Sequence, residues 1–203
     1  FSTFQGKSFA DNPKALYLYL LSNPEFKDCK FIWAFKKPKK YAFLKEHPNT
    51  TVVKICSKKY EKALHSAKYW ITNHRLKEYI YPNDKHFYLQ CWHGTPLKKL
   101  ALDMDKVNMS GHQDIEEYRE KFRESTSVWD YLISQNSYSS KIFRRAFAFD
   151  GEMLEIGYPR NDILVNENNE TKINAIKERL NIDKDKKIIL FISSPRLLIF
   201  LGV

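Results

Sequence analysis

The segment LQCWHGTPLKKLALD, residues 89–103, contains the features that decide the fold. In the segment KHFYLQCW (85–92), both alternating sets of positions are largely apolar, which is typical of a strand buried on both faces of a parallel sheet. Gly94 allows a tight turn or the close approach of a ligand to the backbone. Because Thr95 is a good N-cap and Pro96 suits the first helical position, we expect a helix to begin immediately afterwards.

Strand-like and helix-like segments alternate along the rest of the chain. The expected strands are 29–35, 50–56, 68–73, 85–92, 128–136, 152–157 and 186–192, and the expected helices are 9–23, 58–67, 96–103, 113–122, 138–147 and 171–182. This alternation predicts an α/β fold with a Rossmann-like, mostly parallel sheet and helices on both faces.

A polar stretch without periodicity, residues 163–172, predicts a linker. We therefore expect a Rossmann-like domain over residues 1–165. Residues 166–203 would hold the linker and the incomplete start of a second domain, which begins with the strand 186–192.

The chain is basic, with 34 Lys and Arg against 24 Asp and Glu and a net charge of +10. Such an excess is either a solvated surface or a means of attracting polyanions such as nucleic acid, anionic lipid or a phosphate-rich substrate. The densest group of cations, Lys36-Lys37-Pro38-Lys39-Lys40, is short. Charge alone does not choose among these partners.

The three cysteines, Cys29, Cys56 and Cys91, lie far apart in strand-like surroundings, and we expect buried free thiols. No CxxC pair and no histidine cluster has metal-ligand spacing, so neither a metal nor a cofactor is expected. No secretory signal leads the chain, and no apolar run is long enough to span a membrane. Any membrane contact is therefore expected at the surface.

His93 is expected at the carboxyl end of a central strand, beside a helix N-terminus. This edge is where open α/β sheets bind ligands, and the helix end favours phosphate there. Lys98 and Lys99 add positive charge, and a histidine beside phosphate can act as general base for a hydroxyl nucleophile. The alternative is that His93 is a satisfied turn residue and both lysines face solvent.

Three segments resemble the CDP-glycerol glycerophosphotransferases, which build the poly(glycerol phosphate) or related polyol-phosphate chains of teichoic acids in Gram-positive bacteria. These segments are FQGKSFADNPKALY (4–17), WHGTPLKKLALDMD (92–105) and IGYPRND (156–162), in the order that the family has them. The resemblance implies a transferase of the GT-B type, with two Rossmann-like domains facing each other across a cleft. It also implies a peripheral location on the cytoplasmic face of the cell membrane.

The resemblance further implies that His93 deprotonates the terminal hydroxyl of a lipid-linked teichoic acid acceptor. The resulting oxygen would attack the β-phosphorus of CDP-glycerol and expel CMP. The positive charge of the chain suits an anionic polymer and an anionic membrane surface. The residues expected to bind substrate are Gly94, Thr95, Lys98, Lys99, Asp11, Asn12, Lys14, Arg160 and Asp162.

Structural alternatives remain open for several of these residues. Asp11, Asn12 and Lys14 equally suit the start of a helix, which Asp11 or Asn12 would cap. Arg160 can bind phosphate through its planar fork, or it can form a turn-stabilising ion pair with Asp162.

Members of this family usually continue, after a strand such as KKIILF, with an Ala-Pro-Thr-Trp-Arg-like segment and a full second domain. This domain is expected to carry most of the CDP-glycerol site and a second functional histidine. Here the sequence reads ISSPRLLIFLGV (192–203), so we expect a truncated portion of such an enzyme, either active or inactive by itself. The alternatives are a non-catalytic remnant and a polyanion-binding module. Nucleic acid is not the expected partner, because the aromatic residues fall at expected core positions.

Overall fold

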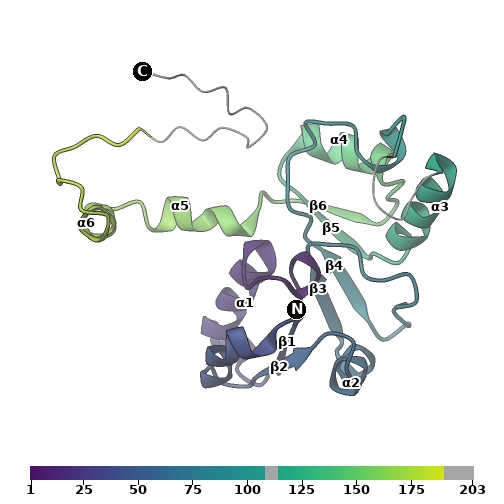
Figure 1. Ribbon diagram of the computed structural model, residues 1–203, viewed down its shortest axis with the longest axis horizontal. Helices are drawn as coiled ribbons and strands as arrows, with labels where there is room; N and C mark the ends of the chain where they lie inside the picture. The colour runs from purple at the N-terminus through teal and green to yellow at the C-terminus, as the bar shows by residue number, and fades with distance from the viewer. Residues whose placement is uncertain (108–113, 190–203) are drawn as a thin grey trace. The chain divides into compact units, whose positions relative to one another are not determined.

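The computed structural model describes residues 1–107 and 114–189 (Figure 1). The chain divides into two compact units, Phe1–Asp162 and Ile163–Val203. The second unit contains the helix α6 (Glu170–Arg179) and all but the first residue of α5 (Asp162–Asn166). The predicted linker is thus partly helical. Of the strand predicted over residues 186–192, the described part, 186–189, is not in a strand. Residues 190–192 lie outside the described residues.

The first unit contains parallel β-sheet. Four strands pair in the order β3-β4-β5-β6, and β1 pairs with β2. All of these pairs are parallel, as the sequence predicts. The strands are β1 (Phe31–Phe35), β2 (Thr50–Lys54), β3 (Tyr69–Thr72), β4 (Phe87–Gln90), β5 (Tyr131–Ser134) and β6 (Glu152–Glu155).

Residues at the start of the chain connect the two sheets. The oxygen of Phe1 accepts a hydrogen bond from the Ala34 nitrogen of β1 at 3.0 Å. The nitrogen of Ser2 donates to the Ile71 oxygen of β3 at 3.1 Å, and Ser2 bridges Thr72 in parallel. This two-residue segment therefore lies between β1 and β3 and extends the backbone hydrogen bonding from one sheet to the other.

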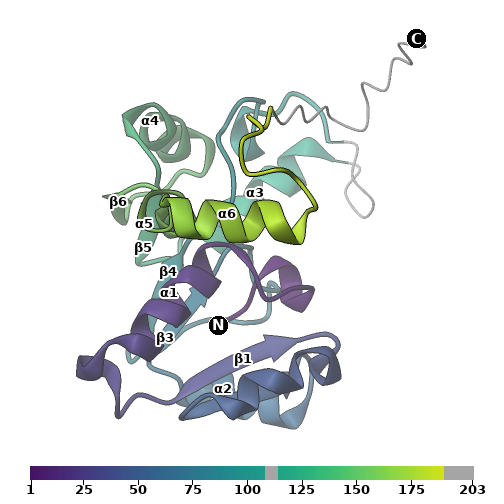
Figure 2. The same cartoon turned by 90° about the vertical axis from the view of Figure 1, so that its left-hand side faces the viewer.

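Four α-helices flank these strands in the described part of the first unit. Figures 1 and 2 place α2 and β1 at one end of this unit and α4 at the opposite end. The helices are α1 (Asp11–Ser22), α2 (Lys58–Ser66), α3 (Ile115–Thr126) and α4 (Ser137–Ala146). The described part of this unit also contains the 3-10 segments η1 (Phe4–Gly6), η2 (Pro24–Phe26), η3 (Pro38–Glu46), η4 (Ala101–Asp103) and η5 (Pro159–Asn161).

The start of α1 differs from the cap expected at Asp11 or Asn12. The N-cap position is Ala10, and no side chain caps it. Asp11 has a φ of 64°, in the left-handed region that few residues other than glycine adopt. The side chains of Asp11 and Asn12 instead bond to segments far away in sequence, and these contacts determine the geometry here.

The helix expected from Pro96 onward is not formed. Residues 91–100 have no regular structure, and the short η4 turn follows. In a continuous helix, Leu97 and Ala101 would lie on the same face, because they are four residues apart. In the structure Leu97 is 81% exposed, whereas Ala101 is buried in the core at 3%. Asp103 is held by both donor groups of Arg145, at 2.9 and 2.7 Å. These tertiary contacts outweigh the local helix signal of Thr95 and Pro96.

The expectation of three buried thiols is correct only for Cys91. Cys29 and Cys56 are exposed, and they lie before β1 and after β2. Cys91 follows the central strand β4 and is 0% exposed. Cys91 packs in an apolar cluster with Ile71 and Ile133 of the neighbouring strands.

Candidate active site

His93 follows the central strand β4 by a few residues, at the carboxyl edge of the parallel sheet. Its side chain is exposed, so it is not packed in the interior. Because no helix begins at Thr95 or Pro96, the helix dipole that the sequence predicted beside His93 is absent from this segment. Residues 95–103 therefore supply no helix dipole beside His93.

The orientation of the His93 ring is set by three contacts. Its Nδ1 lies 2.7 Å from the main-chain oxygen of Asn73, the residue that follows β3. The ring stacks on Trp92 at a centroid distance of 4.6 Å, and it packs edge to face with Phe4 at a centroid distance of 5.6 Å. Since a carbonyl oxygen can only accept, a hydrogen on Nδ1 is required, and the neutral ring then has its lone pair on Nε2. A general base needs such a lone pair.

The loop of residues 91–94 is held by side chains from two distant segments. Asn12 donates from Nδ2 to the oxygens of Cys91 and Trp92, at 3.2 and 3.3 Å. Arg160 donates from Nη1 to the oxygen of His93 at 3.1 Å. The hydroxyl of Tyr158 donates to the oxygen of Gly94 at 3.0 Å. Four consecutive carbonyl oxygens thus accept side-chain hydrogen bonds.

The segments 4–17, 92–105 and 156–162, which carry the family resemblance, therefore meet in space. Contacts between the first and the last complete this arrangement. Asp11 forms an ion pair with Arg160, and Oδ1 of Asn12 accepts from the Arg160 nitrogen at 3.2 Å. The ion-pair partner of Arg160 is thus Asp11, so the alternative pairing with Asp162 is wrong.

The remaining predicted binding residues are less closely associated. Lys98 and Lys99 are exposed, and Lys99 pairs with Asp105 at 2.6 Å. Lys14 lies over the ring of Phe9, with its Nζ 5.2 Å from the centroid. Asp162 is exposed at the start of α5.

Thr95 and Gly94 lie directly after His93. Thr95 is exposed, and its hydroxyl accepts a hydrogen bond from Gln135. A Cβ built on Gly94 would meet no atom within 4 Å, and Gly94 does not have a positive φ. The backbone conformation therefore does not require glycine here, whereas the open space leaves room for a ligand.

A hollow of about 540 Å³ adjoins His93. It is large enough for a small ligand. Apolar side chains form most of its wall, and Lys106 contributes a cation. The lining residues are Trp92, His93, Leu100, Ala101, Met104, Lys106, Tyr118, Phe122 and Phe147.

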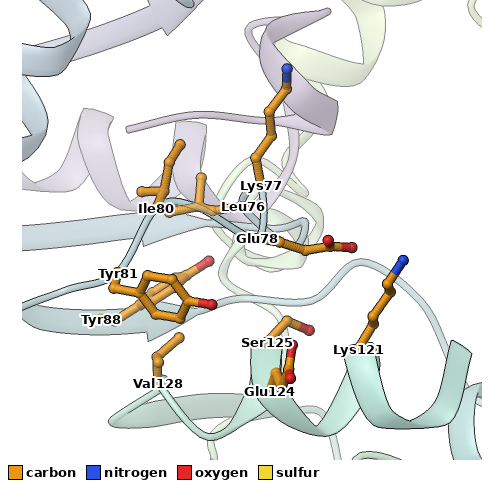
Figure 3. Close-up of a pocket in the computed structure, with 10 residues that line it drawn as sticks. All are labelled: Leu76, Lys77, Glu78, Ile80, Tyr81, Tyr88, Lys121, Glu124, Ser125 and Val128. Atoms are coloured by element: carbon orange, nitrogen blue, oxygen red, sulfur yellow. The ribbon is translucent and has the colours of Figure 1, made fainter. Parts of the chain in front are cut away.

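A second cavity lies between residues 76–81 and α3 (Figure 3). Its volume of about 20 Å³ is close to that needed by one water molecule. None of the predicted site residues lines it. We therefore place the candidate site at His93 and the larger hollow.

Sequence reasoning missed Asn73, His74 and Tyr158. Asn73 and His74 directly follow β3, so a neighbour of His93 could have been sought among polar residues after that strand. Nδ1 of His74 is buried and has no hydrogen-bond partner in the described part of the chain. Burial, and then the charge of His93, lower the pKa of His74 to about 4. His74 is therefore a neutral imidazole near His93 at neutral pH.

A parallel α/β unit with an exposed histidine at the carboxyl edge of a central strand is the kind of domain that Rossmann-like transferases contain. The family model described as "CDP-Glycerol:Poly(glycerophosphate) glycerophosphotransferase" matches residues 1–195. The chain belongs to this family.

Named relatives agree with this assignment. The chain is 45% identical over 191 residues to the "Teichoic acid poly(glycerol phosphate) polymerase" of Bacillus spizizenii, covering 94% of this chain and 48% of that protein. It is 44% identical to the "Teichoic acid glycerol-phosphate transferase" of Staphylococcus aureus, with the same coverage of 94% and 48%. The chain thus spans about half the length of these relatives.

Solved structures confirm the fold. The wall teichoic acid polymerase TagF, solved as a histidine-to-alanine variant, matches with a TM-score of 0.82 and 41% identity, over 92% of this chain and 45% of that one. A histidine-to-asparagine variant of TagF soaked with CDPG gives the same values. The expected α/β fold of one half of a GT-B type transferase is therefore confirmed. No helix in the described residues is long and apolar enough to cross a membrane.

Proposed function

We propose that this chain forms the acceptor-side half of an enzyme that transfers glycerol phosphate from CDP-glycerol to the terminal hydroxyl of a lipid-linked teichoic acid chain, with release of CMP. The observation that carries the proposal is the orientation of His93. Its Nδ1 faces the Asn73 oxygen at 2.7 Å, while the ring lies exposed beside the hollow. The names of the relatives support the choice of substrate and acceptor.

In the proposed reaction, Nε2 of His93 takes the proton of the acceptor hydroxyl. The hydroxyl oxygen forms a bond to the β-phosphorus of CDP-glycerol, and the bond from that phosphorus to the bridging oxygen breaks. CMP leaves with the electron pair. Phosphoryl transfer depends mainly on positioning and on neutralising charge. Arg160 bonds to the His93 oxygen and Lys106 lines the same hollow, so both would supply positive charge, together with Lys98 and Lys99 that follow in the sequence.

We further propose that the protein acts at the cytoplasmic face of the membrane, as a peripheral protein. A lipid-linked acceptor must be reached from the membrane surface. The net charge of +10 would attract the chain to anionic lipid headgroups. The exposed lysines Lys36, Lys37, Lys39 and Lys40 form the densest basic group in the sequence.

Nucleic-acid binding is a weaker explanation of the charge. Base stacking needs exposed aromatic side chains. Trp33, Trp70 and Trp129 are buried, whereas Tyr69, Tyr79 and Tyr81 are exposed, so the aromatic residues do not decide the question. The names of the relatives favour a teichoic acid acceptor instead.

Transfer of label from CDP-glycerol to a lipid-linked acceptor tests the proposal. Because the relatives are twice as long, the assay should use both this chain and a chimaera that adds the remaining half of the Staphylococcus aureus relative. We expect the chimaera to transfer label and release CMP. His93→Ala should lower its rate by about 100-fold or more, as expected for loss of a general base.

His65→Ala is the matched control, since His65 is exposed on α2 and far along the chain from the site. It should leave the rate unchanged. A chimaera without transfer activity, assayed beside the active Staphylococcus aureus enzyme, would refute the function. Near-full activity of His93→Ala would remove His93 from the mechanism while leaving the function intact.

A further inference from the structure

We propose that Asp11 is a positioning residue that fixes the orientation and the tautomer of His93. Its carboxylate bonds to Asn73 and to Arg160, and each of these residues bonds to His93. The catalytic consequence rests on the proposed function, whereas the effect on the tautomer does not.

The contact through Asn73 controls the ring. The side-chain Nδ2 of Asn73 donates to Oδ2 of Asp11, and its Oδ1 accepts from the Phe4 nitrogen at 2.8 Å. Asn73 is 0% exposed. Both ends of its side-chain amide are therefore fixed, and its main-chain oxygen is held where Nδ1 of His93 bonds to it. A ring held in this way keeps Nε2 available as an acceptor.

The contact through Arg160 controls the backbone of His93. Nη1 of Arg160 donates both to Oδ1 of Asp11 and to the main-chain oxygen of His93. The guanidinium also lies 4.6 Å from the ring centroid of Tyr158, whose hydroxyl bonds to the next carbonyl, that of Gly94. Asp11 thus anchors the Arg160 guanidinium, which bonds to the His93 oxygen and packs on Tyr158, the residue that bonds to the Gly94 oxygen.

The burial of Asp11 argues against direct contact with substrate, the role that the family resemblance suggested. Its side chain is only 5% exposed, and each carboxylate oxygen already has a donor, one from Asn73 and one from Arg160. A free carboxylate beside a phosphate would repel it. A buried carboxylate paired with an arginine avoids this repulsion and can still determine geometry.

The loop has a backbone conformation that needs external support. Trp92 has a φ of 47°, in the left-handed region that is costly for a bulky residue. Its nitrogen donates to the side chain of Gln90 at 3.0 Å, and its oxygen accepts from Asn12. Such a conformation persists only where the surroundings determine it, which is what the contacts from Asp11, Asn12 and Arg160 provide.

Asp11→Asn tests the proposal, because the amide has nearly the same shape but one of its two terminal atoms becomes a donor. It can therefore accept from Asn73 or from Arg160, but cannot serve both as the carboxylate does. The tautomer of His93 is measured by nitrogen-15 NMR on the 203-residue chain with labelled histidine, at mildly alkaline pH. His93→Gln assigns the signal.

In the unsubstituted chain we expect His93 as the Nδ1–H tautomer. In Asp11→Asn we expect a mixture of tautomers and broadened ring signals. Asp28→Asn, on an exposed aspartate before β1, is the matched control and should leave the spectrum unchanged. A predominant Nε2–H tautomer in the unsubstituted chain, or an unchanged His93 signal in Asp11→Asn, would overturn the proposal.

Kinetics of the chimaera provide a second readout. Loss of orientation should lower kcat by about 10- to 100-fold and change KM by less than about 3-fold, because a small displacement of a catalytic group has this effect. A raised KM with unchanged kcat would instead show that Asp11 contacts substrate, and would also overturn the proposal. If transfer is absent but the tautomer shifts as expected, the positioning role stands and the proposed function fails.

Arg160→Lys is the second variant, in case Asp11→Asn does not fold. Lysine keeps the charge but lacks the planar fork, so it cannot reproduce the bonding of Arg160 to both Asp11 and His93. We expect the same shift toward mixed tautomers. A His93 signal identical to that of the unsubstituted chain would contradict the proposed contribution of Arg160.

Discussion

Arg160 donates a hydrogen bond from Nη1 to the main-chain oxygen of His93 at 3.1 Å, although 67 residues separate them in the sequence. This contact joins the last of the three family-like segments to the central one. Asn12 joins the first segment to both, since its Nδ2 bonds to residues 91 and 92 and its Oδ1 to the Arg160 nitrogen. The three segments are therefore one structural unit around the exposed imidazole.

Gly94 and Gly6 form a contrasting pair. Gly94→Ala should change the free energy of unfolding by less than about 0.5 kcal/mol, because the added Cβ meets no atom and φ is not positive. Gly6→Ala should cost more than about 1 kcal/mol, because Gly6 has a φ of +73° and its Cβ would lie 3.0 Å from the Lys36 nitrogen and 3.1 Å from the Ala34 oxygen. Urea unfolding measures both. Equal losses of stability would contradict the argument.

If substrate approaches the backbone at Gly94, Gly94→Ala should also raise the KM of the chimaera while the protein remains as stable as before. An unchanged KM would show that the open space at this glycine is not used by the ligand.

His74 should make stability depend on pH. Its pKa is about 4 in the folded chain against 6.5 for an ordinary histidine, mainly because of burial and then because of His93 and Lys36. Between these values the unfolded chain binds a proton that the folded chain does not. The free energy of unfolding is therefore highest above pH 6.5. It decreases by up to about 3 kcal/mol as the pH falls toward 4.

His74→Gln should remove this component, so the difference between the unfolding free energies of the variant and the unsubstituted chain should change across pH 4–6.5. His65→Gln, on the exposed surface of α2, is the control and should give a nearly constant difference. A constant difference for His74→Gln as well would show that His74 is not a neutral buried group.

The cysteines should differ in their reactivity. Cys29 and Cys56 are exposed, whereas Cys91 is buried, and burial followed by the negative charge of Asp11 raises its pKa. Ellman's reagent should therefore react with two thiols in the folded chain and with three after denaturation. Rapid reaction of Cys91 in the native protein would mean that the apolar cluster around this thiol opens.

Attraction to anionic membranes should depend on the basic group. The chain should pellet with phosphatidylglycerol-containing vesicles at low salt and be released at high salt. Changing Lys37, Lys39 and Lys40 together to glutamine should weaken pelleting more than changing Lys58, Lys59 and Lys62 of α2. Both triple variants lower the net charge from +10 to +7, so only the position differs. Salt-independent pelleting would exclude an electrostatic origin.

Several strands of the first unit could be predicted closely because most of their residues are buried, as in β1, β3 and β5. Runs such as FIWAF in β1 and YLIS in β5 are short and apolar, as buried parallel strands are. The position of His93 at the sheet edge followed from the end of β4. The helix after Pro96 could not be excluded from the sequence, because Ala101 and the Asp103–Arg145 pair determine that path through tertiary contacts.

The contacts that hold His93 could not be predicted from the sequence for a different reason. From the sequence, Asp11 resembles a helix cap and Arg160 resembles an ion-pair partner of Asp162, because both interactions join residues that are close in the sequence. The observed ion pair joins residues 149 positions apart. Only the folding of η5 against α1 brings them together. Asn73 gave no signal apart from its position after β3.

The shared carboxylate of Asp11 also affects how mutational scans of this protein should be interpreted. A scan for lost activity would score positions 11, 12, 73, 158 and 160 alongside the imidazole, and would suggest a large set of chemical participants. In double-mutant cycles these positions should instead behave epistatically. Once one support is gone, removing a second should add little, and removing the base itself should mask them all.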